Sequence, residues 1–210
     1  QLLSGHGLTP GLFTSPHLHR VEERFENGLH QMTPEQFAAA VAELAPIVDL
    51  FEERSGEGVT YFELTTALAY AWFAESASDV AVIETGLGGR LDATNAVDSD
   101  VAVVTTIGLE HTAYLGDTIA EIASEKLAIL NAGATLVTGV LPAEADAIAA
   151  AAAAEFGAVW LSLGRDFEIA DARSLDGRWA FDLRSVYDEY TDIELRLRGR
   201  HQVDNFATAV

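Results

Sequence analysis

Apolar runs alternate along this chain with stretches that carry helical signals. DVAVIET (residues 79–85) and DVAVVTTI (100–107) are almost continuous runs of apolar and β-branched residues. This is the pattern of parallel strands that are covered on both faces. Shorter runs of the same kind predict further strands at 10–14, 134–139 and 158–163.

The stretches between these strands predict helices. Thr33 is a suitable N-cap, Pro34 a suitable first helical residue, and Gln36 stands at the capping-box position of a helix that runs to about residue 54. Pro46 predicts a kink within this helix. Further helices are predicted over 60–75, 117–130 and 143–156.

Strands that alternate with helices predict an α/β fold, with a doubly wound and mostly parallel sheet. After about residue 164 the pattern changes to one of alternating residues. Residues 166–185 predict a β-hairpin with Asp176-Gly177 as its turn, and residues 192–199 predict a third strand. We therefore expect a small antiparallel β segment near the C-terminus.

Composition narrows the classes of function. The chain has 210 residues, 49% of them hydrophobic, which is enough for a sizeable core. A net charge of −21 argues against a nucleic-acid or anionic membrane surface, so we expect neither partner. The absence of cysteine excludes disulfides and thiolate metal sites.

Glu84 and His111 are candidates for a metal site. Each follows a predicted parallel strand, and ligands of open parallel sheets bind at the carboxyl ends of strands. A carboxylate and an imidazole at adjoining strand ends suit a divalent cation. A loop carboxylate and a hydrogen-bonded loop histidine fit the same pattern, so the residues alone leave both interpretations open.

Two short motifs add to this picture. GLGGR (86–90) allows a close approach of backbone to a neighbour or ligand, although any tight turn would use glycine in this way. TSPHL (14–18) follows the first strand and offers the hydroxyl of Ser15 to a cation or phosphate, although Ser-Pro turns are common.

Lys126 is the only lysine, because all the other members of the 12 Lys+Arg residues are arginines. A lysine can lose its proton and act as a nucleophile, whereas a guanidinium effectively cannot. One possible product is a carbamate formed with CO₂, which would give an oxygen ligand in place of a cation. A lysine on an exposed helix face is the alternative.

Five ordered segments together resemble one family, the folylpolyglutamate synthases and dihydrofolate synthases of the Mur ligase superfamily. The segments are LFTSPHLHRVEERF, TYFELTTALAYAWF, VIETGLGGRLDATN, TTIGLEHTAYLGDTIAEIASEKLAIL and LRGRHQVDNFATA. The resemblance implies the Mur ligase P-loop ATPase fold. It also implies an ATP-dependent ligase that adds L-glutamate to a folate or dihydropteroate carboxylate through an acyl phosphate.

The resemblance also implies site residues and small-molecule partners. It places Ser15, Glu84, His111 and Lys126 as ligands of Mg²⁺, with two ions expected, and Lys126 as an N6-carboxylated lysine. Glu84, His111 and Lys126 would be the catalytic residues, and Asn205 would lie near the adenine of ATP. The implied substrate-binding residues are Thr60, Tyr61, Phe62, Glu63, Leu91, Asp92 and Ala93.

The chain departs from the family pattern in two ways. Glu110 stands where the family usually has Asp before the motif histidine. The phosphate-binding G-x-x-G-K-[ST] motif does not occur in the 210 residues. We therefore expect an internal fragment, with residues 1–200 as a partial central ATPase domain and 201–210 as the hinge and the start of a C-terminal domain. The fragment alone should neither bind ATP tightly nor turn over.

Two alternatives stay open at this point. Another Mur-type ligase would share the Mg²⁺ and carbamate chemistry but act on a different acid, such as a nucleotide-linked sugar acid. A protein without a P-loop would instead be a non-catalytic module that binds pteroate or metal. For the ligase, ATP dependence and the lack of a visible signal sequence imply a cytoplasmic location, and we expect a monomer.

Overall fold

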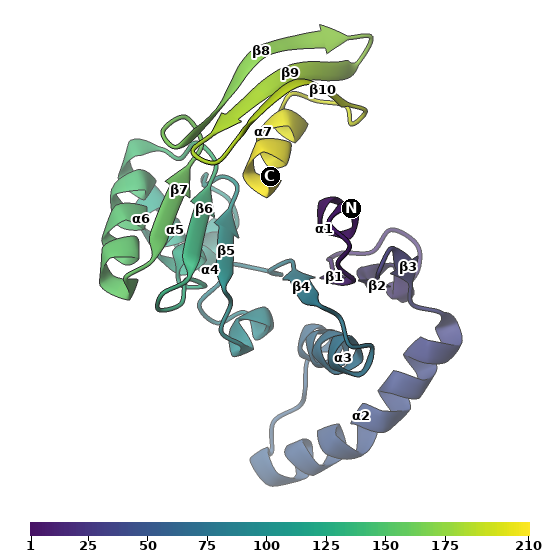
Figure 1. Ribbon diagram of the computed structural model, residues 1–210. Coiled ribbons are helices and arrows are strands. Elements are labelled where there is room, and N and C mark those ends of the chain that lie inside the picture. Colours follow the sequence, from purple (N-terminus) through teal and green to yellow (C-terminus); the bar gives the residue numbers. More distant parts are fainter. The chain divides into compact units, whose positions relative to one another are not determined.

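The computed structural model describes all residues from 1 to 210, and they form two compact units (Figure 1). Unit 1 comprises Gln1–Leu87 and Leu91–Ala96, and unit 2 comprises Gly88–Arg90 and Val97–Val210. Each unit has sheets and a buried core of its own. No helix of the chain is long and apolar enough to cross a membrane.

Unit 1 contains one mixed sheet, with the strand order β3-β2-β1-β4. β1 and β4 are parallel, with Pro10 opposite Val80 and Phe13 opposite Ile83, whereas β2 is antiparallel to both of its neighbours. The elements of unit 1 are α1 (Leu2–Gly5), β1 (Pro10–Phe13), the 3₁₀ helix η1 (Val21–Arg24), β2 (Phe25–Asn27), β3 (His30–Gln31), α2 (Pro34–Ser55), α3 (Tyr61–Glu75), β4 (Val80–Ile83) and the 3₁₀ turn η2 (Ala93–Ala96).

The two long helices of unit 1, α2 and α3, each begin after a threonine N-cap with a capping box. The Gln36 N–H donates to Thr33 Oγ1 (3.2 Å), and the Thr33 N–H donates to Gln36 Oε1 (2.8 Å), which confirms the predicted capping box of α2. Helix α2 continues through Pro46 as one helix. Both helices contribute to a core around the fully buried rings of Phe13 and Phe25.

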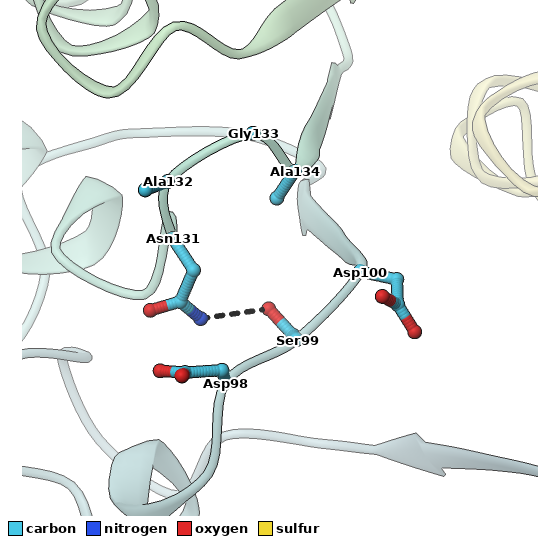
Figure 2. A pocket seen from close by; sticks show the side chains of 7 residues that line it. All are labelled: Asp98, Ser99, Asp100, Asn131, Ala132, Gly133 and Ala134. Carbon is cyan, nitrogen blue, oxygen red and sulfur yellow. Dashed lines mark hydrogen bonds between the residues drawn. The ribbon is translucent and has the colours of Figure 1, made fainter.

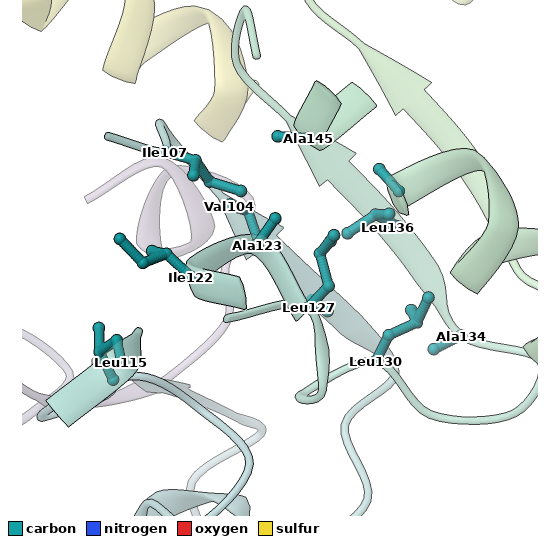
Figure 3. Packing of buried hydrophobic residues seen from close by; sticks show 12 residues of the cluster. Val104, Ile107, Leu115, Ile122, Ala123, Leu127, Leu130, Ala134, Leu136 and Ala145 are labelled. Atoms are coloured by element: carbon teal, nitrogen blue, oxygen red, sulfur yellow. The ribbon is translucent and has the colours of Figure 1, made fainter. Parts of the chain in front are cut away.

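Unit 2 begins with a parallel sheet of order β5-β6-β7. Helices α5 and α6 contribute to its core, in which Ile122, Leu127 and Leu136 lie together (Figure 3). The elements of this part are β5 (Val101–Val104), α4 (Thr112–Leu115), α5 (Ile119–Leu127), β6 (Thr135–Thr138), α6 (Ala143–Phe156) and β7 (Val159–Ser162).

The C-terminal part of unit 2 is an antiparallel sheet of order β10-β9-β8, covered on one side by α7 (Figure 1). The predicted turn is confirmed, because Asp176 and Gly177 have φ angles of 49° and 82°, the left-handed region that a two-residue hairpin turn requires. The elements are β8 (Phe167–Leu175), β9 (Arg178–Ser185), β10 (Glu189–Leu195) and α7 (His201–Ala209).

The α/β class, the parallel strands and the C-terminal antiparallel segment are confirmed. The parallel strands, however, belong to two sheets and not to one continuous sheet. β4 and β5 each stand at a sheet edge, and Val82, Val101 and Val103 are exposed although we expected strands covered on both faces. The short strands β2 and β3 were not predicted, because two or three residues are too few for a periodic pattern.

Candidate active site

The carboxyl ends of β1 and β4 bring Ser15 and Glu84 together. Because the two strands are parallel neighbours, their ends lie at the same edge of the sheet of unit 1. The Glu84 N–H donates to the Phe13 carbonyl (2.9 Å), which continues the pairing by one residue. The Ser15 N–H donates to Glu84 Oε2 (2.7 Å). Glu84 is exposed and its Oε1 makes no hydrogen bond, so this oxygen is available to a ligand.

The loop that carries Ser15 is held by a carboxylate that the sequence did not single out. Glu23, in η1, accepts from the backbone N–H groups of Leu18 (2.8 Å), His19 (3.2 Å) and Arg20 (3.0 Å). These hydrogen bonds, with that from Leu18 first, lower the pKa of Glu23. A glutamate three residues after a helix-start position was the available signal.

The predicted substrate segment TYFE forms the start of α3. Thr60 and Glu63 make a capping box, in which the Thr60 N–H donates to Glu63 Oε2 (2.7 Å). The hydrogen bonds from Thr60 lower the pKa of Glu63. The ring of Phe62 packs 6.0 Å from that of Phe13, between centroids, and a Cβ on Gly86 would lie 2.4 Å from its Cζ atom. The absence of a side chain at Gly86 therefore leaves room for the Phe62 ring.

The second predicted substrate segment, LDA, is organised by Asp92. Its Oδ2 accepts from the Leu87 N–H (2.8 Å), and its Oδ1 accepts from the Thr94 N–H (2.9 Å). The Tyr70 hydroxyl donates to the Thr94 carbonyl (2.6 Å), and burial followed by the charge of Asp92 raises the pKa of Tyr70. Leu91 is exposed and Ala93 begins η2. The carboxylate of Asp92 thus shapes the loop after Gly86.

In unit 2, His111 lies in the loop after β5. Its backbone is left-handed (φ 51°, ψ 35°) and caps the short helix α4. Its carbonyl accepts from the N–H groups of Tyr114 (2.9 Å) and Leu115 (3.0 Å), which fixes the backbone. The imidazole is exposed and makes no hydrogen bond, so either ring nitrogen is open to a ligand.

Lys126 lies in the last turn of α5 and faces the His111 loop. Its Nζ atom lies 3.0 Å from Glu110 Oε1, and its side chain is 22% exposed. Glu110, the residue that departs from the family pattern, thus pairs with the only lysine and links α5 to the residue next to His111. Within unit 2 the structure brings these two candidate ligands into one neighbourhood.

The segment Gly88–Arg90 anchors the same helix. The Arg90 N–H donates to the Glu125 carbonyl (3.1 Å), and Arg90 Nε donates to Glu125 Oε1 (2.8 Å). A Cβ on Gly89 would lie 2.6 Å from the Glu125 carbonyl oxygen and 3.0 Å from that of Lys126. The glycine therefore allows backbone to pack on backbone, which accounts for part of the GLGGR motif.

Asn205 is separated in sequence from all these residues and lies on α7. It is exposed, and its Nδ2 atom donates to Gln202 Oε1 at 3.4 Å within the same helix. The amide is thus on the surface of unit 2, where a ligand can reach it.

The donor set in each unit suits a hard cation only in part. No group of three or more His, Cys, Asp or Glu residues is arranged to hold a metal ion. The Ser15 hydroxyl and the open oxygen of Glu84 are the kind of ligand that Mg²⁺ prefers. Lys126 as an ammonium cannot bind a cation, whereas a carbamate on its Nζ atom would supply oxygen ligands.

A pocket of about 520 Å³ lies elsewhere in unit 2 (Figure 2). It is at the amino ends of β5 and β6, where Asn131 Nδ2 donates to Ser99 Oγ (3.3 Å). Asp98 and Asp100 also line it. His111 follows the carboxyl end of β5, so this acidic pocket is not part of the predicted site.

The fold and the sequence place the chain in a class of ligases. The chain belongs to the Mur ligase family, because the model of the Mur ligase middle domain matches residues 33–210. Within this family it is similar to folylpolyglutamate synthase. The enzyme of Lacticaseibacillus casei is 36% identical over 210 residues, which cover 100% of this chain and 49% of the relative.

Solved structures agree. A Mycobacterium tuberculosis folylpolyglutamate synthase complexed with ADP and AMPPCP is 33% identical with a TM-score of 0.94, and the match covers 99% of this chain and 48% of that chain. A folylpolyglutamate synthase complex with AMPPCP and folate is 36% identical with a TM-score of 0.95, over 99% and 51% of the two chains. The chain thus spans about half the length of its relatives, and the resemblance seen in the sequence is confirmed.

Proposed function

We propose that the whole protein is an ATP-dependent ligase that adds L-glutamate to a folate or dihydropteroate carboxylate. The acceptor carboxylate takes the terminal phosphoryl group of ATP, the amine of glutamate attacks the acyl phosphate, and an amide, ADP and phosphate result. The observation that carries the proposal is the hydrogen bond between Ser15 and Glu84 at the carboxyl ends of β1 and β4, where Ser15 belongs to TSPHL and Glu84 lies two residues before GLGGR. The similarity to folylpolyglutamate synthases supports it.

The proposed roles rest on the resemblance of the motifs to the family, and the positions of the side chains within each unit are compatible with them. Ser15 and Glu84 of unit 1, and His111 and a carboxylated Lys126 of unit 2, would be Mg²⁺ ligands, with two ions expected. Bound Mg²⁺ would neutralise charge that develops on phosphoryl oxygens. The protein's own task is to position these groups, and the hydrogen bonds of Glu84 and the anchoring of α5 by Arg90 support that task.

Carboxylation of Lys126 needs a neutral amine. The Nζ lone pair would attack CO₂, an N–C bond would form, one proton would leave to solvent, and a carbamate anion would remain. The Nζ atom lies 3.0 Å from Glu110 Oε1, so this contact has to open before the amine can meet CO₂. The part of Lys126 that is exposed gives CO₂ access to the amine.

Substrate contacts are proposed for TYFE and LDA. Tyr61 and Leu91 are exposed and can meet an aromatic ring of the pteroate substrate. Thr60, Glu63, Asp92 and Ala93 would shape the same surface through the caps and turns described above. Asn205 would contact the adenine of ATP.

The remaining expectations concern the whole protein. We assign residues 1–200 to the central ATPase domain and 201–210 to the hinge and the start of the next domain. β4 and β5 each leave one edge unpaired, which supports a larger doubly wound sheet completed by further strands. ATP dependence favours a cytoplasmic location, and we expect a monomer.

The proposal is tested by the products of the whole protein. Incubation with MgATP, L-glutamate and either dihydropteroate or tetrahydrofolate should yield the glutamylated product by mass spectrometry and one ADP per amide. Omission of glutamate should abolish the amide. Product formed only with a nucleotide-linked sugar acid would assign the protein to another Mur-type reaction, and binding of pteroate without any product would leave a non-catalytic module.

A further inference from the structure

Arg24, at the end of η1, is a buried cation without a carboxylate partner. The residue is 7% exposed, and no acidic oxygen lies within ion-pair distance of its guanidinium. This is unusual in a chain with a net charge of −21. A buried charge is normally paired, because its desolvation costs several kcal/mol.

The other arginines show the contrast. Six of them form ion pairs with Asp or Glu, and their side chains are 46–60% exposed. The exposed guanidinium groups of these six are therefore paired, while the buried one of Arg24 is not. Packing alone does not need a charge at this position, since a neutral side chain would fill the space without the desolvation cost.

Two contacts fix the orientation of the Arg24 guanidinium. Its Nε–H donates to His17 Nδ1 (3.0 Å), and its Cζ atom lies 5.3 Å from the centre of the Tyr61 ring. The terminal nitrogens Nη1 and Nη2 make no hydrogen bond. The side-chain oxygens of Ser4 and Thr66 are the polar atoms that are fully buried and also lack a hydrogen bond. The terminal nitrogens of Arg24 are not among them, so they keep access to solvent. Their edge of the guanidinium can therefore receive a ligand.

We propose that Arg24 is an anion-binding residue whose Nη1 and Nη2 atoms hold the carboxylate of the pteroate part of the substrate. The inference rests on the proposed function. Its neighbours support it, because His17 belongs to the TSPHL loop that carries Ser15, and Tyr61 belongs to the TYFE segment. A guanidinium binds a carboxylate through two parallel hydrogen bonds, and here its plane is already set before the ligand arrives.

The test compares an acid with its neutral ester. Binding of pteroate, of pteroate methyl ester and of L-glutamate to the whole protein is measured by calorimetry for the wild type, Arg24→Gln and Arg24→Lys. We expect Arg24→Gln to weaken pteroate binding by about 10- to 100-fold, the range of a lost hydrogen bond to a charged group. The affinity of Arg24→Lys for pteroate should lie between those of the wild type and Arg24→Gln. The methyl ester should bind to the wild type and to Arg24→Gln with the same affinity.

The matched control is Arg20→Gln. Arg20 lies four residues before Arg24, and its side chain is 60% exposed and paired with Glu22. The substitution removes the same charge and should leave the affinity for pteroate within about twofold of the wild type. If Arg24→Gln fails to fold by circular dichroism, the ratio of acid to ester affinity in Arg24→Lys decides.

Four results would overturn the inference, and each has its own meaning. Equal loss of acid and ester binding in Arg24→Gln would make Arg24 a structural residue. If Arg24→Gln binds pteroate normally but loses binding of L-glutamate, the anion held by Arg24 would be a carboxylate of glutamate. A wild-type protein that binds neither pteroate nor its ester would remove the pteroate site of the proposed function itself, whereas equal wild-type binding of acid and ester would remove only the role of Arg24.

Discussion

The two units hold their candidate metal ligands in different ways. In unit 1, Ser15 and Glu84 follow paired strands, and a hydrogen bond of 2.7 Å joins them. In unit 2, His111 lies in an exposed left-handed loop position, and Lys126 lies on a helix and pairs with Glu110. The first pair is set by strand geometry, whereas the second depends on a loop and a helix.

The unit 1 ligands are therefore preorganised, whereas Lys126 in unit 2 has to be chemically modified before it can act as a ligand. Glu84 is already a carboxylate with one open oxygen, so it can bind a cation as it stands. Lys126 carries a positive charge in its ion pair and becomes a ligand only after a covalent change. We therefore expect the unit 1 ligands to respond to substitution directly, and the unit 2 ligands to respond also to the supply of CO₂.

The largest expected effect is that of Glu84→Gln in the whole protein. The amide oxygen of Gln can still accept from the Ser15 N–H, so the fold should be kept while the charge on the open oxygen is lost. We expect kcat to fall by roughly 10²- to 10³-fold, the range for loss of one electrostatic stabiliser. Steady-state ADP release measures it, with Glu75→Gln at the exposed end of α3 as the control. Full activity of Glu84→Gln would exclude Glu84 as a metal ligand.

The next effect concerns Lys126, and the rarity of lysine makes it measurable. In the chain of residues 1–210 the only ε-amine is that of Lys126. Incubation with ¹³C-bicarbonate should give one carbamate carbon signal from a side chain, and the Lys126→Arg variant should give none, because a guanidinium does not form the carbamate. In the whole protein, Lys126→Arg should lower kcat by roughly 10- to 100-fold, because the charge is kept but no oxygen ligand arises. An unlabelled Lys126 in a fully active protein would contradict carboxylation.

A smaller effect is expected on stability from Gly89→Ala. The added Cβ would lie 2.6 Å from the backbone oxygen of Glu125, which cannot move without shifting the helix that carries Lys126. Overpacking of this kind costs about 1–3 kcal/mol. Urea unfolding of the chain measures the loss, and Gly108→Ala, where nothing lies within 4 Å of the new Cβ, is the matched control in the same unit. Equal midpoints for the two variants would show that the Gly89 contact does not hold α5.

The sequence predicts the elements better than it predicts their assembly. The β-branched runs and the Thr33 cap carry local signals that decide where strands and helices begin. The edges of β4 and β5 carry no such signal, because a strand's neighbours depend on chain that is distant in sequence. The division into two sheets was therefore missed.

The candidate site shows the same limit. The strand-end position of Glu84 could be predicted, since a parallel pattern fixes where strands end. The contacts of Arg24 with His17 and Tyr61 could not, because they join a loop, a 3₁₀ helix and the start of α3. The capping role of Glu63 could have been predicted, because Thr60 and Glu63 have the spacing of a capping box. This capping box was not predicted from the sequence.

The smallest expected effect tests how far unit 1 is preorganised. Glu23 holds the Ser15 loop through three backbone N–H groups, which lower its pKa below the ordinary value of 4.5. The ionised form is therefore favoured by the folded state, so this stabilisation is fully present above about pH 4.5 and is lost as pH falls through the lowered pKa. The melting temperature of Glu23→Gln should lie below that of the wild type at pH 6, and the gap should narrow towards pH 3. A gap that stays constant with pH would mean that the charge of Glu23 does not hold the loop, and that Ser15 is placed by the strands alone.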